Sequence, residues 1–112
     1  MVFNKKIVKL VFIHIYKMDV ILSKSTNKNK KFDVVVNGKT ISFGDAKYSD
    51  YTINKDPKRK ENYINRHKKN EDWNDVQTKG FWSKNLLWNK PTLKSSVDDI
   101  NRKFKNLNVN MK

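Results

Sequence analysis

The chain has 112 residues, and its 25 Lys and Arg against 11 Asp and Glu give a net charge of +14. At this length we expect one domain, because the chain is too short for a TIM barrel or a complete doubly wound dinucleotide-binding sheet. The sequence contains no cysteine, which excludes disulfide scaffolds, thiolate metal sites and a cysteine nucleophile. Its 13 aromatic residues are enough for a compact core.

The positive charge favours a polyanionic partner such as nucleic acid. The chain has 22 Lys but only 3 Arg, together with 15 Asn, a composition typical of AT-rich genomes, so codon usage is a second explanation of the charge. Lysine is a solvated point charge, whereas arginine reads guanine and phosphate with two parallel hydrogen bonds. The composition therefore favours non-specific attraction to phosphate over the reading of a base sequence.

For residues 1–31 we predict a basic N-terminal extension, either partly disordered or containing an incorrectly assigned start before Met18. Residues 7–22 are rich in apolar side chains, but charged residues interrupt the run, so it does not predict a membrane span. No small-residue cleavage site follows it, and we expect a protein that is not secreted. The run predicts an extra strand or helix, and residues 23–31 predict a polar linker.

The clearest local pattern lies between residues 32 and 43. FDVVV and KTISF flank Asn37-Gly38, a dipeptide that suits a two-residue type I′ turn. This turn pairs Phe32 with Phe43 and predicts a β-hairpin with one apolar face. Something must cover that face, because an isolated hairpin is only marginally stable. The face consists of Phe32, Val34, Val36, Ile41 and Phe43.

Three helices follow the hairpin in the prediction. Asp56-Pro57 joins an N-cap residue to proline at the first helical position, so we expect a helix from residue 57 to about 69. A short aromatic helix follows Gly80 and ends at Pro91. A last helix is expected to be capped by Ser95 or Ser96, with Asp98 and Asp99 in its first turn. Its apolar stripe is Val97, Ile100, Phe104 and Leu107.

The sequence therefore predicts an α+β fold, a small antiparallel β-hairpin or sheet packed against two or three short helices. We place this single domain at residues 32–107, with a tail at 108–112. Three stretches, YSDYT at 48–52, RHKKNEDW at 66–73 and GFWSKNLLWNKP at 80–91, carry a resemblance to a known family. Over residues 32–105 the chain resembles short basic proteins of nucleocytoplasmic large DNA viruses, the mimivirus and algal-virus group. That family has no characterised function, so the resemblance implies only a viral protein of the host cytoplasm or viral factory, or one packaged in the virion.

The predicted helix at 57–69 is strongly basic. A basic helix with neighbouring aromatic side chains can follow a phosphate backbone and stack on exposed bases. We therefore expect a non-catalytic protein that binds nucleic acid or another polyanion non-specifically, and the alternative is a solvated helix face without a binding role. The candidate nucleic-acid-binding residues are Lys55, Lys58, Arg59, Lys60, Tyr63, Arg66, Lys68, Lys69 and Trp73.

A second hypothesis is a virion structural or adaptor module that contacts a viral structural protein through aromatic side chains, which often dominate interfaces. The other interpretation of residues 81–88 is that they cover the hairpin, with Trp82 and Leu86 buried. The candidate partner-binding residues are Tyr48, Tyr51, Phe81, Trp82 and Trp88.

A third, minor hypothesis is a magnesium-dependent nuclease. Asp33 and the run Asp45-Ala46-Lys47 match a pattern in which two carboxylates hold the metal and a lysine positions the attacking water. The hairpin register argues against it. Asp33 and Asp45 would point to opposite faces of the hairpin unless the chain bends at Gly44. We expect no metal site, no cofactor and no small-molecule substrate.

Overall fold

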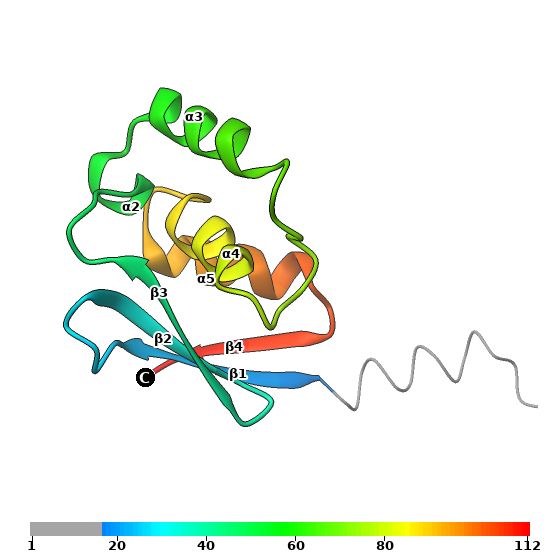
Figure 1. Cartoon of the computed structure of the whole chain (residues 1–112). Coiled ribbons are helices and arrows are strands. Elements are labelled where there is room, and N and C mark those ends of the chain that lie inside the picture. The colour runs from blue at the N-terminus through cyan, green and yellow to red at the C-terminus, as the bar shows by residue number, and fades with distance from the viewer. Residues whose placement is uncertain (1–16) are drawn as a thin grey trace, which may run out of the picture.

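The computed structural model describes residues 17–112 and contains a four-stranded sheet with helices on one face (Figure 1). The sheet order is β3-β2-β1-β4. β2 pairs antiparallel with both β1 and β3, whereas β4 runs parallel to β1. The predicted α+β class is confirmed, although the sheet is mixed rather than antiparallel. The strands are β1 (Met18–Lys24), β2 (Lys30–Val36), β3 (Lys39–Asp45) and β4 (Leu107–Met111).

The helices lie between β3 and β4 in the chain. α4, η1 and α5 cover the sheet, and α3 lies over them, farther from the sheet (Figure 1). The η1 segment is a π-helical turn that continues the aromatic helix predicted after Gly80, with Trp88 N–H donating to the Ser83 carbonyl. The segments are α2 (Tyr51–Asn54), α3 (Pro57–His67), α4 (Lys79–Trp82), η1 (Ser83–Leu87) and α5 (Leu93–Lys103).

The predicted hairpin is confirmed residue by residue. Phe32 pairs with Phe43, and the turn residues Asn37 and Gly38 have φ values of 51° and 79°, as a type I′ turn requires. The apolar face packs against the aromatic helix, in which Trp82 and Leu86 have no exposed surface. The expectation that these two side chains lie inside is therefore confirmed.

The predicted domain boundaries at 32 and 107 were too narrow, because two strands outside them belong to the sheet. β1 lies between β2 and β4 and buries Val20 and Leu22, and β4 buries Val109. The predicted linker at 23–31 was also wrong, since it contains the end of β1, a tight turn and the start of β2. The expectations for residues 1–16, including a start before Met18, lie outside the described residues.

The last helix begins earlier than predicted. Thr92 is its N-cap, and Ser95 occupies the third helical position of a capping box rather than the cap itself. Asp98 and Asp99 therefore lie beyond the first turn. The helix ends at Lys103. Leu107, the last residue of the predicted apolar stripe, is therefore buried as part of β4 and not as part of the helix. Similarly, α3 ends at residue 67 rather than 69.

Gly44 lies where β3 passes close to η1, and it gives a test of this packing. A Cβ at Gly44 would lie 2.7 Å from Leu87 Cδ1, whereas a Cβ at Gly38 would have no described atom within 4 Å. Both glycines have φ near +80°. We expect Gly44→Ala to lower the free energy of unfolding by at least about 1 kcal/mol more than Gly38→Ala, because only Gly44→Ala adds a clash to the cost of positive φ. Equal losses on chemical denaturation would contradict the close contact with η1.

Candidate functional site

The α3 helix is held to the rest of the protein at a small number of positions. The Asp56 carboxylate caps its first turn by accepting from the backbone N–H groups of Lys58 and Arg59. Lys60 Nζ donates to the Asn89 carbonyl at 2.7 Å. Tyr63 is the one buried residue of the helix. Most of α3 therefore faces solvent, and its charged side chains are available to a partner.

Tyr63 is the centre of an aromatic stack. Its ring lies 4.6 Å from that of Trp88, with an interplanar angle of 7°, and 4.2 Å from that of His67, with an angle of 25°. Burial, and secondarily Glu71, raise the pKa of the Tyr63 hydroxyl, so it stays neutral. Both faces of the ring are covered, so the prediction that Tyr63 stacks on a nucleic-acid base is wrong.

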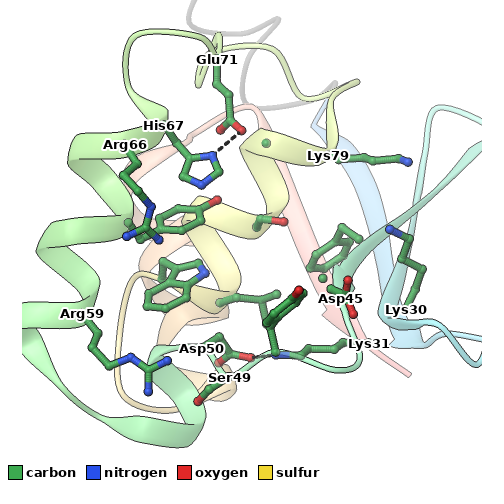
Figure 2. Close-up of a pocket in the computed structure, with 18 of the residues that line it drawn as sticks. Lys30, Lys31, Asp45, Ser49, Asp50, Arg59, Arg66, His67, Glu71 and Lys79 are labelled. Atoms are coloured by element: carbon green, nitrogen blue, oxygen red, sulfur yellow. Dashed lines mark hydrogen bonds and ion pairs between the residues drawn. The ribbon is translucent and has the colours of Figure 1, made fainter.

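A pocket of about 600 Å³ lies between α3 and the ends of β2 and β3 (Figure 2). Its apolar lining comes from Phe43, Leu87 and Trp88. The α3 side contributes Arg59 and Arg66. In Figure 2 these arginines lie on one side of the pocket, and Lys30 and Lys79 lie on the other.

The pocket has an excess of positive charge. Lys31 is neutralised by the buried Asp50, with 2.5 Å between Nζ and Oδ2, and His67 Nδ1 lies 3.0 Å from Glu71 Oε1. Four other cations at the pocket make no ion pair with any residue in 17–112, and the carboxylates that lie near them are Asp45 and Glu71, whose partner is a histidine. These cations are Lys30, Arg59, Arg66 and Lys79.

The structure divides the remaining predicted nucleic-acid-binding residues into two groups. Lys55 Nζ donates to the carbonyls of Thr52 and Pro91, so Lys55 helps to hold α3 as Lys60 does. Burial, followed by repulsion from neighbouring lysines, lowers the pKa of Lys60. Lys58, Lys68 and Lys69 are exposed, and Lys58 makes a loose ion pair of 3.4 Å with Glu61.

Trp73, the other predicted stacking residue, is held by polar contacts. Its indole Nε1 donates to Glu71 Oε2 at 2.8 Å, and Lys84 Nζ lies 4.9 Å from the ring centre. The ring is only half-buried. Trp73 is thus partly exposed but does not line the pocket.

Two of the five aromatic side chains predicted to bind a partner are internal. Phe81 and Trp82 are 0% exposed, so both belong to the core and their assignment to a partner surface is wrong. Tyr51 and Trp88 are half-buried. Tyr48 is 71% exposed and lines the pocket.

The carboxylates of the nuclease pattern do not meet. Asp33 is buried, and its Oδ1 accepts hydrogen bonds from Ser42 and Ser25, which lower the pKa of its carboxyl. Asp45 lines the pocket, whereas Asp33 does not. Residues 17–112 contain no group of three or more His, Asp or Glu that could hold a metal ion.

Lys30 and Lys79 are pocket residues that the sequence analysis missed. The hairpin register, extended by two residues beyond Phe32, places Lys30 opposite Asp45, and this signal was available in the sequence. No local pattern brings Lys79 to the same place, because it enters the pocket through the packing of α4.

Residues 20–67 match the model of a family of unknown function, DUF5754. The match covers less than half of the chain and extends from β1 to the end of α3, so it includes the basic helix, Lys30 and most residues that line the pocket, but not Lys79. No curated protein and no solved structure gives a significant match. Within the part of the chain that the structure describes, no helix combines the length and apolar character needed to cross a membrane.

Proposed function

We propose that this protein binds nucleic acid, or a similar polyanion, non-specifically and without catalysing a reaction. The observation that supports this most directly is the pair Arg59 and Arg66, exposed two turns apart on α3 and without an ion pair among the described residues. A guanidinium group can bind a phosphate through two parallel hydrogen bonds. Lys68 and Lys69 extend the same positive region past the end of the helix.

Non-specific binding fits the chemistry of this surface. Phosphate contacts position a protein on nucleic acid but carry no sequence information, and most cations of the chain are lysines. In the viral setting that the resemblance over residues 32–105 implies, the partner would be the genome or its transcripts in the host cytoplasm, the viral factory or the virion. A viral structural protein is a weaker candidate, because the core position of Phe81 and Trp82 leaves Tyr48 as its most exposed aromatic contact.

The test is fluorescence anisotropy with labelled single- and double-stranded DNA and RNA at about 50 and 200 mM salt. The double variant Arg59→Glu/Arg66→Glu should weaken binding by more than about tenfold and reduce the slope of log K against log salt by about 2, because two phosphate contacts are lost. Its stability should stay close to that of the wild type, because both side chains are exposed.

The matched control is Lys39→Glu/Lys105→Glu, which changes the net charge by the same amount. Both lysines are exposed, and they lie at the end of the sheet opposite to Lys30 and Asp45. The control should bind more tightly than the α3 variant. Equal weakening would mean that net charge alone drives binding, and the assignment to α3 would be wrong. No binding of wild-type protein at about 50 mM salt would refute the proposed function itself.

A further inference from the structure

The pocket beside α3 has properties that a helix binding a phosphate backbone does not need. Its volume of about 600 Å³ lies within the range of roughly 300–1,000 Å³ typical of small-molecule sites. The buried side chains of Phe43 and Leu87 give it apolar surface, and most of its other lining residues are polar or charged. A concave site that joins apolar surface to converging polar groups suits one small organic ligand.

The cations of the pocket come from separate elements and lie on opposite sides. Arg59 and Arg66 belong to α3, Lys30 to the start of β2 and Lys79 to the start of α4 (Figure 2). An anion in the pocket would lie in the positive potential of both pairs, which favours a phosphate with its high negative charge.

Buried contacts hold the sides of the pocket in place. The Asp50 carboxylate accepts from the backbone N–H of Thr52 and pairs with Lys31, so it fixes the loop after β3 to the start of β2. On the other side, the stack of Tyr63 on Trp88 fixes α3 to the end of η1. A site that is formed before binding avoids the entropy cost of ordering, which favours affinity for a small ligand.

The remaining lining residues suit a nucleoside. Tyr48 is 71% exposed at the pocket and offers an aromatic face to a base, as stacking residues of single-strand-binding proteins do. Asn62, Ser49 and the Asp45 carboxylate offer hydrogen-bonding groups to a base or a sugar.

We propose that this pocket binds one nucleoside phosphate, with the phosphate between the arginines and lysines and the base against Tyr48. The ligand is either a free nucleotide or the terminal nucleotide of a strand that carries an end phosphate. This inference rests on the proposed function and deepens it, because Arg59 and Arg66, which support that function, also line the pocket, and the pocket is assigned to a strand end or a single nucleotide.

The first experiment is an NMR titration of the full chain with nucleoside monophosphates, the matching nucleosides and inorganic phosphate. Monophosphates should shift the amides around Gly44, Ser49 and Asn62 in a saturable way, and unphosphorylated nucleosides should not. Inorganic phosphate should bind at least about tenfold more weakly than the nucleotide, because it makes no base contacts. Equal binding of both would overturn the assignment to a nucleoside phosphate.

The second experiment separates this inference from the proposed function. Single-stranded oligonucleotides with a 5′-phosphate, a 3′-phosphate or neither are compared by anisotropy, using wild type, Lys30→Ala/Lys79→Ala and the charge-matched control Lys39→Ala/Lys105→Ala. Wild type and the control should each bind at least one end-phosphorylated strand more tightly than the unphosphorylated strand. That preference should disappear in Lys30→Ala/Lys79→Ala.

Each outcome of this comparison decides one of the two proposals. If the three oligonucleotides bind equally well with a steep salt dependence, and no free nucleotide binds, the pocket assignment is wrong and the proposed function stands. If nucleotides bind but no oligonucleotide does, the pocket assignment stands in its free-nucleotide form and the proposed function is wrong.

Discussion

Replacing Trp82 with alanine is expected to lower the free energy of unfolding by about 3–5 kcal/mol, the usual cost of removing a large aromatic side chain from a core. Trp82 has no exposed surface, packs edge-on against Phe81 at 4.8 Å and donates its indole N–H to the Val76 carbonyl at 2.7 Å. The loss is a large part of the total stability of a domain of this size. Urea denaturation followed by far-UV circular dichroism measures it.

Two further variants show whether this cost comes from core packing. Trp82→Phe keeps most of the ring and loses the hydrogen bond, so it should cost about 1–3 kcal/mol. Tyr48→Ala removes an exposed aromatic from the same predicted partner-binding set and should change stability by less than about 0.5 kcal/mol. If Trp82→Ala were as stable as wild type, the core described around α4 would be incorrect.

Local signals in the sequence were enough to predict the hairpin, the start of α3 and the aromatic helix. The Asn37-Gly38 turn sets the strand register by itself, and Asp56-Pro57 sets the helix start through backbone geometry and capping. None of these features needs a contact with a distant part of the chain. This is why they could be predicted without knowledge of the tertiary structure.

The sequence predicted an extra strand or helix within residues 7–22 but did not place β1 in the sheet, and it missed β4, because the pairing of these strands is not local. Asp19 and Asn108 are joined by a hydrogen bond across 89 positions of the chain. In β1, the outward-facing Ile21 hides the alternation of buried and exposed residues. In β4, the alternation in LNVNM is strict, but Leu107 also fits the three-residue spacing of the preceding helix. Only the end of α5 at Lys103 decides between the two patterns.

The candidate site shows the same limit. Charge along the chain identified α3, but it did not show which lysines are tied to other segments. Lys60 and Lys55 donate to carbonyls 29 and 36 positions away, so only the tertiary structure distinguishes them from free phosphate ligands. Likewise, the sequence spacing places Tyr63 on the same face of α3 as Arg59 and Arg66. In the structure, however, the ring of Trp88, at the C-terminal end of η1, stacks on the Tyr63 ring and covers it. The pocket was not predicted because five separate elements, α3, β2, α4, β3 and η1, contribute its cations and its apolar side chains.

Asp99 links α5 to the segment that holds α3. Its Oδ2 accepts from Asn89 at 2.8 Å, and the Asn89 carbonyl in turn accepts from Lys60 on α3. The Asp99 side chain is 2% exposed and also pairs with Arg102 and Lys103. Burial raises the pKa of Asp99, but the hydrogen bond from Asn89 and the pairing with Lys103 outweigh it and lower the pKa to about 2.

A lowered carboxyl pKa stabilises the folded state above the pKa of the unfolded chain, about 3.8, and this contribution disappears as the pH falls towards 2. At pH 7 we expect Asp99→Asn to lower the free energy of unfolding by about 2–3 kcal/mol, and at pH 2 by less than about 0.5 kcal/mol. Chemical denaturation of both proteins at each pH gives the difference. The lowered pKa of Asp33 affects both proteins alike, so it cancels. A difference that is the same at pH 7 and pH 2 would mean that Asp99 stabilises the fold by shape and not by charge, and the electrostatic link from α5 to α3 would be wrong.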